Sequence, residues 1–364
     1  MKQAQHIEKK PVILIGVLDW GLGHACRMIP VIHYLLQTQC QILIAATGQQ
    51  RKVLELEFPN LEFLSPPEYD VKYNEKSRNL VFGLIRQLPR LFQVITTEKE
   101  WTRQIHRLYG LDLIISDNRY GMRLKEVISI VITHQIAPIS GLGAFFDNIL
   151  MEMHIRYLSF FNECWVPDMK EGGLAGKLSH SALKFKKLKF IGLLSRFENF
   201  VSPTPSNPGL LVLLSGPEPR RTYFEELLLP QLTSYKGTYT LVRGLPGHIK
   251  TIPNSVNHLE AKELQELIQN AEFIICRAGY TTIMDLAKIG KTAVLVPTTG
   301  QTEQEYLGAH LQKAGYFLHS NEEGFNLQHE VDRLCNFSPS KPVVDFQQFK
   351  LAVDELLSQL NSKV

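Results

Sequence analysis

The chain has 364 residues, a length that predicts two or three domains with room for sizeable buried cores. Hydrophobic residues make up 44% of the chain and charged residues 21%, which is ordinary for a soluble globular protein. The net charge of +3 is too small to favour nucleic acid as a main partner, so none is expected.

Neither the cysteines nor the first residues indicate export. The five cysteines are widely spaced and form no C-x-x-C pair, which predicts free thiols rather than a disulfide framework or a zinc site. Residues 1–10 are polar and lack the apolar core of a secretory signal, and no run of about 18 apolar residues would span a membrane. We therefore expect a cytoplasmic protein.

The first half of the chain alternates apolar runs with helical patterns. A buried strand is predicted at 11–18, a glycine turn at 19–24, a helix at 25–36 and a second strand at 41–46. This succession predicts a parallel sheet with right-handed crossovers. Further strands or helices are expected at 61–64, 79–97 with an interruption at Pro89, 111–116, 128–133, 147–162, 163–167 and 190–192.

A stretch rich in Pro and Ser divides the chain. Residues 202–209 have no apolar period and are interpreted as a linker between domains at 1–201 and 210–345, with a final helix at 346–364. That helix could cross back onto the first domain. In the second domain, strands are predicted at 210–214, 239–242, 256–259, 273–276 and 293–296, and helices at 220–229, 261–270, 280–289 and from 303. The expected fold class is α/β, with two Rossmann-like domains whose parallel sheets face a central cleft.

The most informative stretch is 273–314. A strand, the turn Arg277-Ala278-Gly279 and a helix ending at Gly290 place free N–H groups and a positive helix end at the carboxyl edge of the sheet. That arrangement suits a phosphate group. Asp285 in this helix and Glu303-Gln304 at the next helix start could bind sugar and ribose hydroxyls. Acidic residues in first turns also simply complement the helix dipole, so both interpretations stay open.

This stretch resembles the donor-binding half of GT-B glycosyltransferases. It is most similar to the transferase that adds N-acetylglucosamine to the lipid-linked peptidoglycan precursor, through the C-terminal domain of glycosyltransferase family 28. The resemblance implies that Asp285 binds the nucleotide ribose and that Gln304 binds the donor sugar. Glu305 replaces the family's second glutamine. The residues that carry the resemblance are Cys276, Arg277, Ala278, Gly279, Thr282, Asp285, Gly290, 294–297 and Gln304.

The first glycine turn places a histidine at a helix start. It is not a dinucleotide fingerprint, because Cys26 stands where the third glycine would be, and no cofactor is expected. A helix N-terminus lowers the pKa of a histidine, and a neutral imidazole can take a proton from an attacking hydroxyl. His24 is therefore the predicted catalytic base. Asp19 would orient it, act as the base itself, or only accept turn N–H bonds.

The resemblance extends to this turn. The pattern Gly-Leu-Gly-His-Ala-x-Arg from Gly21 is similar to related bacterial and archaeal GT-B proteins, one of which hydrolyses a nucleotide sugar during nonulosonic acid synthesis with the matching histidine. His134-Gln135 stand at the place of a Glu-Gln pair in the lipid-precursor transferase, and Asp117 ends a predicted strand. The expected acceptor-side residues are Gly23, Asp117, His134 and Gln135.

The resemblance implies further donor contacts in the second domain. Ser215-Gly216 would meet the donor phosphate, Arg243 the diphosphate and Leu259 the base. No Asp-x-Asp motif ends a strand, and GT-B enzymes normally stabilise the leaving diphosphate with helix dipoles and basic side chains, so no metal is expected. The expected donor-binding residues are Ser215, Gly216, Arg243, Leu259, Arg277, Gly279, Thr281, Thr282, Asp285, Glu303 and Gln304.

These features predict a metal-independent, inverting hexosyltransferase. It would move a sugar from a nucleotide sugar, a UDP-hexose or UDP-N-acetylhexosamine, to a hydroxyl acceptor that is lipid-linked or part of a cell-envelope glycan. The alternatives are a nucleotide-sugar hydrolase or epimerase, and a non-catalytic nucleotide-sugar-binding protein. Apolar segments with interspersed basic residues at 80–92 and 183–190 would allow peripheral contact with the inner face of the cell membrane. A core helix and an exposed basic strand would explain them equally well.

Overall fold

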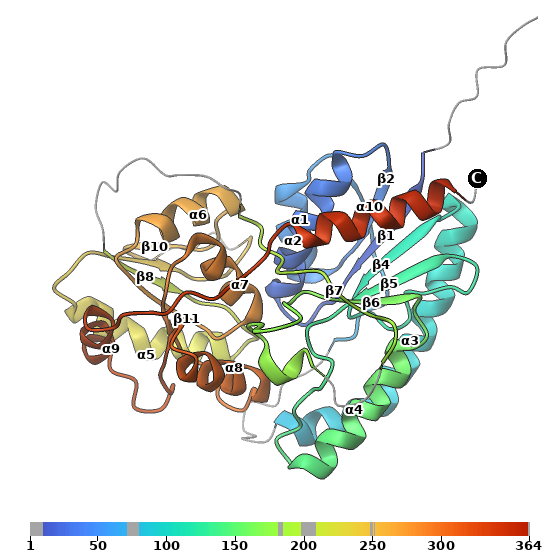
Figure 1. Cartoon of the computed structure of the whole chain (residues 1–364). Coiled ribbons are helices and arrows are strands. Elements are labelled where there is room, and N and C mark those ends of the chain that lie inside the picture. Colours follow the sequence, from blue (N-terminus) through green and yellow to red (C-terminus); the bar gives the residue numbers. More distant parts are fainter. Residues whose placement is uncertain are drawn as a thin grey trace, which may run out of the picture.

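The protein consists of two α/β lobes that lie side by side, each built on one parallel sheet (Figure 1). This computed structural model describes residues 10–70, 80–180, 185–197, 209–247, 250 and 252–362, without the side chains of 80–86, 88 and 361. Most of the expected linker, 202–208, lies outside the described residues. The expected fold class, two Rossmann-like domains with parallel sheets, is confirmed.

The first lobe contains a seven-stranded sheet in the order β3-β2-β1-β4-β5-β6-β7. Its central strands are buried on both faces, which explains why they are continuous apolar runs in the sequence. The strands are β1 (Val12–Val17), β2 (Gln41–Ala45), β3 (Glu62–Leu64), β4 (Leu113–Asp117), β5 (Ile128–Ile132), β6 (Glu163–Val166) and β7 (Leu188–Phe190). The helices are α1 (Leu22–Leu36), α2 (Gly48–Glu57), α3 (Leu80–Tyr109), α4 (Ala144–Leu158) and the 3-10 helix η1 (Gly176–Leu178).

The second lobe contains a six-stranded sheet in the order β10-β9-β8-β11-β12-β13. Its strands are β8 (Leu210–Leu213), β9 (Tyr239–Val242), β10 (Ser255–Val256), β11 (Phe273–Cys276), β12 (Val294–Leu295) and β13 (Leu318–His319). Its helices are α5 (Arg220–Ser234), α6 (Ala261–Asn270), α7 (Tyr280–Ile289), α8 (Thr302–Lys313) and α9 (Leu327–Cys335). The predicted bounds of α6, β11 and α7 agree with the structure, and α7 ends at Gly290 with a left-handed φ of 74°.

The register of the first sheet brings three chain segments to one edge. Val17 pairs with Asp117, and Asp117 pairs with Ile132, so the residues that follow β1 and β5 lie on either side of the end of β4. In the second lobe β8, β11 and β12 are neighbours and end together in the same way. The two edges meet where α1 lies against α7.

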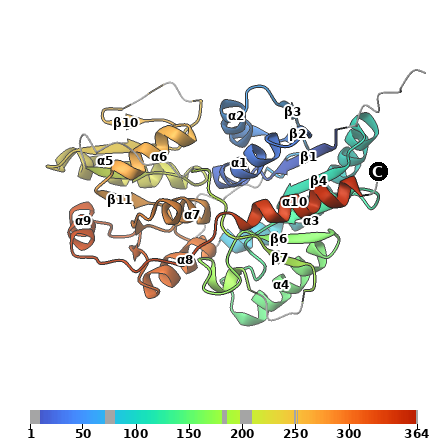
Figure 2. The ribbon, with the colours of Figure 1, turned by 45° about the horizontal axis from the view of Figure 1, so that its top comes forward.

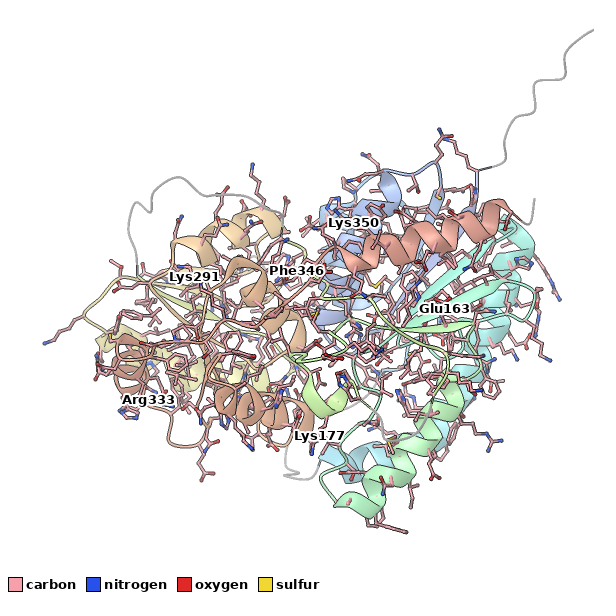
Figure 3. All side chains as sticks on the ribbon, viewed as in Figure 1. Glu163, Lys177, Lys291, Arg333, Phe346 and Lys350 are labelled. Carbon is pink, nitrogen blue, oxygen red and sulfur yellow. The ribbon has the colours of Figure 1, made fainter. Side chains whose placement is uncertain are left out.

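The last helix, α10 (Gln348–Asn361), lies on the first lobe (Figures 1 and 2). Phe349 contacts the Tyr34 ring of α1 at a centroid distance of 5.9 Å, and the Tyr34 hydroxyl donates to Asp354 Oδ1 at 2.8 Å. Phe346 and Lys350 mark the point where the chain passes from one lobe to the other (Figure 3). The chain therefore connects the two lobes twice.

Helix α3 differs from the expected pattern. The sequence predicted an interruption at Pro89, but α3 runs without a break from Leu80 to Tyr109. Pro89 is exposed, so the carbonyl that loses its hydrogen bond can be solvated while both flanking halves stay helical. The C-terminal half of α3 therefore reaches the residues that follow β4.

A buried ion pair joins α3 to the end of β4. The Arg119 Nε donates to Glu98 Oε1 at 2.6 Å, and both side chains are fully buried. Arg119 Nη1 also donates to the Val17 carbonyl at 3.0 Å, and the Tyr69 hydroxyl donates to Glu98 Oε2 at 2.9 Å. These contacts hold the ends of β1 and β4 in fixed positions.

We expect Glu98→Ala to lower the free energy of unfolding by about 3–5 kcal/mol, because it leaves Arg119 buried without a counter-charge. Glu100→Ala is the matched control, since Glu100 lies on the same helix with its side chain 59% exposed. Denaturant unfolding followed by circular dichroism measures both variants. Equal losses in the two would contradict a structural role for the pair.

Candidate active site

A buried carboxylate lies between a guanidinium and an imidazole at the edge of the first sheet. Asp117 is the last residue of β4 and is fully buried. The Arg27 Nε donates to Asp117 Oδ1 at 2.8 Å, and Arg27 Nη2 donates to the same oxygen. His24 Nδ1 lies 2.9 Å from Asp117 Oδ2. His24 and Arg27 are three residues apart on α1, so both reach the carboxylate from one helix face.

The contacts of His24 Nδ1 decide its tautomer. Arg27 Nη2, a donor, lies 2.7 Å away, and Asp117 Oδ2, an acceptor, lies 2.9 Å away, so only one can form a hydrogen bond at a time. A proton on Nδ1 satisfies Asp117 Oδ2, which has no other partner in the described part of the chain, while Arg27 keeps its bonds to Oδ1. We therefore assign the Nδ1–H tautomer, in which Nε2 carries the free lone pair.

The local charges keep this imidazole neutral. Burial lowers the pKa of His24, and the Arg27 charge lowers it further, against the opposing effect of Asp117. Burial would raise the pKa of Asp117, but Arg27 and His24 outweigh it and hold the pKa below its usual value. The His24 side chain is 17% exposed, so a ligand can reach it. At neutral pH His24 can accept a proton at Nε2.

The network continues across the lobe interface through His134. Arg27 Nη1 donates to His134 Nδ1 at 3.3 Å, and His134 Nε2 donates to Glu303 Oε1 at 2.7 Å. The Gln135 amide donates to the other Glu303 oxygen. The His134 ring stacks on Tyr280 of α7 at a centroid distance of 4.4 Å. The predicted acceptor-side pair and the predicted donor-side Glu303 therefore contact each other directly.

The N-termini of α1 and α7 face each other at the interface of the two lobes. Helix α1 begins after Gly21 and α7 after Gly279, and neither has a side-chain cap or an acidic residue in its first turn. The Thr281 hydroxyl donates to the Gly23 carbonyl at 3.0 Å, an approach that any side chain at Gly23 would crowd. Each helix N-terminus carries about half a positive charge, so the junction favours an anion.

Hydroxyl and N–H groups lie together at the carboxyl ends of β8, β11 and β12. Ser215 and Gly216 follow β8, and Thr282 lies in the first turn of α7. Among the described residues the Thr298 hydroxyl is buried with no hydrogen-bond partner, and a Cβ at Gly216 would lie 3.7 Å from it. Hydroxyl and N–H groups at neighbouring strand ends are typical of ligand sites in open α/β sheets.

The known proteins to which this chain is similar are glycosyltransferases. Residues 254–353 match the glycosyltransferase family 28 C-terminal domain. An uncharacterized glycosyltransferase of Methanosarcina acetivorans is 24% identical over 322 residues, which is 84% of each chain. The spinosyn rhamnosyltransferase SpnG, complexed with thymidine diphosphate, superposes with a TM-score of 0.58 at 14% identity over 97% of this chain and 96% of that one. For the glycotransferase of kitacinnamycin the TM-score is 0.63 at 13% identity, over 97% and 100% of the two chains.

The chain has the GT-B fold, and its residues 254–353 match a glycosyltransferase domain. Its second lobe carries the family 28 match, which runs on into α10. The structural likeness covers both lobes and supports the fold of the whole chain.

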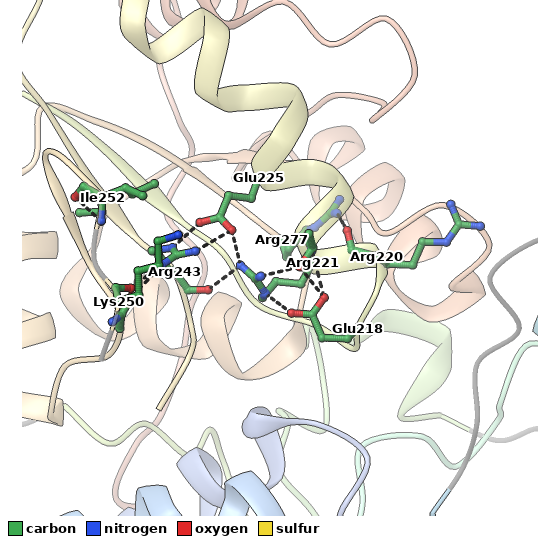
Figure 4. Close-up of polar contacts among 11 residues, drawn as sticks. Glu218, Arg220, Arg221, Glu225, Arg243, Lys250, Ile252 and Arg277 are labelled. Atoms are coloured by element: carbon green, nitrogen blue, oxygen red, sulfur yellow. Dashed lines mark hydrogen bonds and ion pairs between the residues drawn. The ribbon is translucent and has the colours of Figure 1, made fainter. Parts of the chain in front are cut away.

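Arg243, expected at the donor diphosphate, and Arg277, expected among the donor-binding residues, are both held in ion pairs, of which Figure 4 shows that of Arg243 with Glu225. Arg243 Nη2 donates to Glu225 Oε2 at 3.2 Å, and Arg277 Nη1 donates to Glu322 Oε2 at 3.0 Å. Arg277 also lies over the Phe224 ring, with its Cζ 4.0 Å from the centroid. Carboxylates of the second lobe therefore already balance both positive charges.

The remaining expected donor residues lie in different surroundings. Asp285 is 1% exposed, and its partners are Ser195 and Arg196 of the first lobe. Gln304 Oε1 accepts from the Thr298 N–H at 2.9 Å and so supports the loop after β12. Leu259 is half-buried in the segment before α6.

Asp19 lies apart from the imidazole contacts. Its Oδ2 accepts from the Tyr69 N–H at 2.9 Å, and its Oδ1 is buried without a partner among the described residues. The carboxylate that contacts His24 belongs to Asp117. Asp19 thus accepts backbone N–H groups of residues 69 and 70, in another segment of the chain, rather than those of its own turn.

Sequence reasoning assigned no role to Arg27, Tyr280 or Arg196. For Arg27 the spacing of three residues after His24 was a usable signal, because it places both on one face of α1. Arg196 lies shortly before the linker in a stretch without any motif, so no local signal could have found it.

We expect Arg27→Met to raise the pKa of His24. The substitution removes a positive neighbour and leaves Asp117 to stabilise the imidazolium. NMR titration of the histidine ring resonances measures the shift. Arg51→Met, which breaks an exposed pair with Glu55 on α2, is the control. A His24 pKa that falls or stays constant in Arg27→Met would refute the electrostatic account.

Proposed function

We propose that this glycosyltransferase is a metal-independent, inverting hexosyltransferase whose donor is a UDP-hexose or UDP-N-acetylhexosamine. One observation carries the proposal: the His24–Asp117 pair stands at the N-terminus of α1, directly opposite the uncapped N-terminus of α7. A proton acceptor and an anion site thus lie on either side of one junction. A transfer from a sugar diphosphate to a hydroxyl needs these two features.

In the proposed reaction His24 Nε2 takes the proton of the acceptor hydroxyl while its oxygen bonds to the anomeric carbon. The bond from that carbon to the diphosphate oxygen breaks, and its electron pair leaves with the nucleoside diphosphate. Attack opposite the leaving group inverts the anomeric configuration. Asp117 stabilises the imidazolium that forms. The ends of α1 and α7 offset the charge on the leaving group, a role that a metal fills in other enzymes.

The proposed donor site lies on the second lobe, which is supported by the family 28 match there and by the Thr298 hydroxyl, which has no partner among the described residues. Ser215, Gly216 and the turn at Gly279 would hold the diphosphate, with Thr281 and Thr282 beside it. Asp285 would bind the ribose, Leu259 the base and Gln304 the sugar, as the family resemblance implies. The likeness to SpnG, solved with thymidine diphosphate, supports a nucleoside diphosphate as the leaving group.

We expect His24→Ala to lower the transfer rate by about 10²–10⁴-fold, because general base catalysis contributes that much. Nucleotide affinity should change little, since the imidazole faces the acceptor. Calorimetry with UDP measures binding, and UDP release from UDP-sugars over a panel of hydroxyl acceptors measures turnover. Parallel loss of both properties would contradict the role of His24. Release of free sugar without any acceptor would instead indicate hydrolysis.

We further propose that the acceptor is lipid-linked and that α4 brings the enzyme to a membrane surface. Helix α4 buries only Met151 and Leu158, and Phe145 is 71% exposed. Exposed apolar patches of this kind mark interaction sites. We call the following residues the α4 face: Phe145, Phe146, Ile149, Leu150, Met153 and Phe160.

Basic groups border the α4 face and suit an anionic lipid surface. The Arg123 Cζ lies 4.2 Å from the centroid of the Phe160 ring, and Lys187 Nζ donates to the Ser159 carbonyl at 2.7 Å. Arg156 is exposed on the same helix. The N-terminal end of α4 lies near the lobe junction, because the Thr302 hydroxyl donates to the Ile139 carbonyl at 2.6 Å. A lipid-bound acceptor there would be within reach of the site.

The segments expected at the membrane are only partly described. Residues 80–92 form the start of α3, but most of their side chains lie outside the described residues, as does the beginning of 183–190. None of the helices that the structure describes has both the length and the apolar composition needed to cross a bilayer.

We expect the double variant Phe145→Ser/Phe146→Ser to bind anionic vesicles at least about tenfold more weakly, because each exposed Phe contributes about 1.5–3 kcal/mol when it is buried in lipid. Co-sedimentation with phosphatidylglycerol vesicles at low salt measures the change. Val343→Ser/Leu351→Ser removes equally exposed apolar side chains elsewhere and should bind as the parent does. If the parent protein stays in the supernatant, the membrane proposal fails.

A further inference from the structure

The carboxylate of Asp285 belongs to the second lobe, but its described side-chain partners come from the first. The Ser195 hydroxyl donates to Asp285 Oδ1 at 2.7 Å, and Arg196 Nε donates to Oδ2 at 3.0 Å. The Ser195 hydroxyl also accepts from the Phe197 N–H at 3.2 Å, which fixes its orientation. Each oxygen of Asp285 thus accepts from a side chain of the first lobe, and the residue is 1% exposed.

Arg196 connects three parts of the molecule. Its Nη1 donates to the Cys26 Sγ of α1 at 3.0 Å, while its Nε binds Asp285 of α7. The side chain is 12% exposed. Its charge also acts on His258, whose pKa is lowered to about 4, first by burial and then by Arg196. Arg196 therefore stands between α1, α7 and the segment that leads into α6.

This position coincides with the nucleoside side of the proposed donor site. Asp285 and Leu259 are the residues proposed there for the ribose and the base, and His258 is adjacent in sequence. Asp285 is so deeply buried that a ribose diol can reach its carboxylate only through the space that Ser195 and Arg196 now fill. An unpaired buried carboxylate is strongly unfavourable, so Arg196 can leave only as another donor arrives. The two occupants are thus mutually exclusive.

We propose that Arg196 is a latch that holds Asp285 and keeps the lobes together without donor, and that it competes with the donor ribose for this carboxylate. The latch rests on the proposed role of Asp285 at the ribose. Donor binding then has to break an ion pair between the lobes, so nucleotide affinity is reduced by the fraction of molecules that are latched.

The test compares Arg196→Met with the parent enzyme. Methionine keeps much of the length of the side chain and removes the charge. We expect UDP and thymidine diphosphate to bind about tenfold more tightly by calorimetry, because the latched fraction disappears. Small-angle scattering without ligand should show a larger radius of gyration. Arg333→Met, which breaks a pair with Glu330 on α9, is the matched control and should change neither quantity.

A second variant separates the latch from a simple loss of packing. Asp285→Asn removes the ion pair but leaves groups that can bond Ser195, so the lobes should open while nucleotides bind more weakly. Unchanged compactness, or unchanged or weaker nucleotide binding in Arg196→Met, overturns the latch. If the parent and both variants bind neither nucleotide, the proposed function fails, and the scattering data alone then decide whether the pair holds the lobes together.

Discussion

The candidate site depends on one buried negative charge, that of Asp117. A carboxylate at the end of a central strand, removed from solvent, is stable only if cations or donors surround it. Arg27 supplies two bonds to one oxygen, and His24 supplies one to the other. This demand orients the imidazole, selects its tautomer and turns its free nitrogen away from the carboxylate. The orientation of the His24 imidazole is thus a consequence of stabilising the buried charge of Asp117.

The junction between the lobes combines apolar and polar contacts. One apolar cluster runs from the first lobe through α10 and α7 into the second, and it includes Met284 and Phe349. Such contacts are not directional, so they bring the lobes together without choosing a single arrangement. The directional contacts are polar: Thr281 with Gly23, His134 with Glu303 and Arg196 with Asp285. Each pairs one group of the first lobe with one of the second, which fixes the relative position of the two lobes.

The sequence predicted most of the fold because its signals are local. Long apolar runs identified β1 and β11, and Gly290 marked the end of α7. Strand β13 was not expected, because a strand of two residues leaves too short a pattern. Pro89 was expected to interrupt α3, whereas the structure tolerates it on an exposed face. The helix-forming residues on either side of Pro89 outweigh the tendency of proline to interrupt a helix.

The sequence indicated some residues of the candidate site but not which of them contact each other. His24 and Asp117 were both identified, yet Asp19 seemed the natural partner of His24 because it is near in sequence. Sheet order decides otherwise: β1 lies beside β4, so the actual partner is 93 residues away. The same holds for Asp285 and Arg196, 89 residues apart. No spacing rule in a single sequence reports contacts between segments that far apart.

Helix α10 packs on the first lobe, although it follows the whole second lobe in the sequence. The surface of α1 around Tyr34 is covered by α10, and its partner Asp354 lies 320 residues further along the chain. Synthesis proceeds at roughly 5–20 residues per second, so the first lobe is made well before α10. During this time the apolar surface of α1 that α10 later covers is exposed to solvent. A chain truncated before residue 348 would carry every proposed site residue and still leave this apolar surface open to water. Translation must therefore pass α10 before the first lobe can be fully covered.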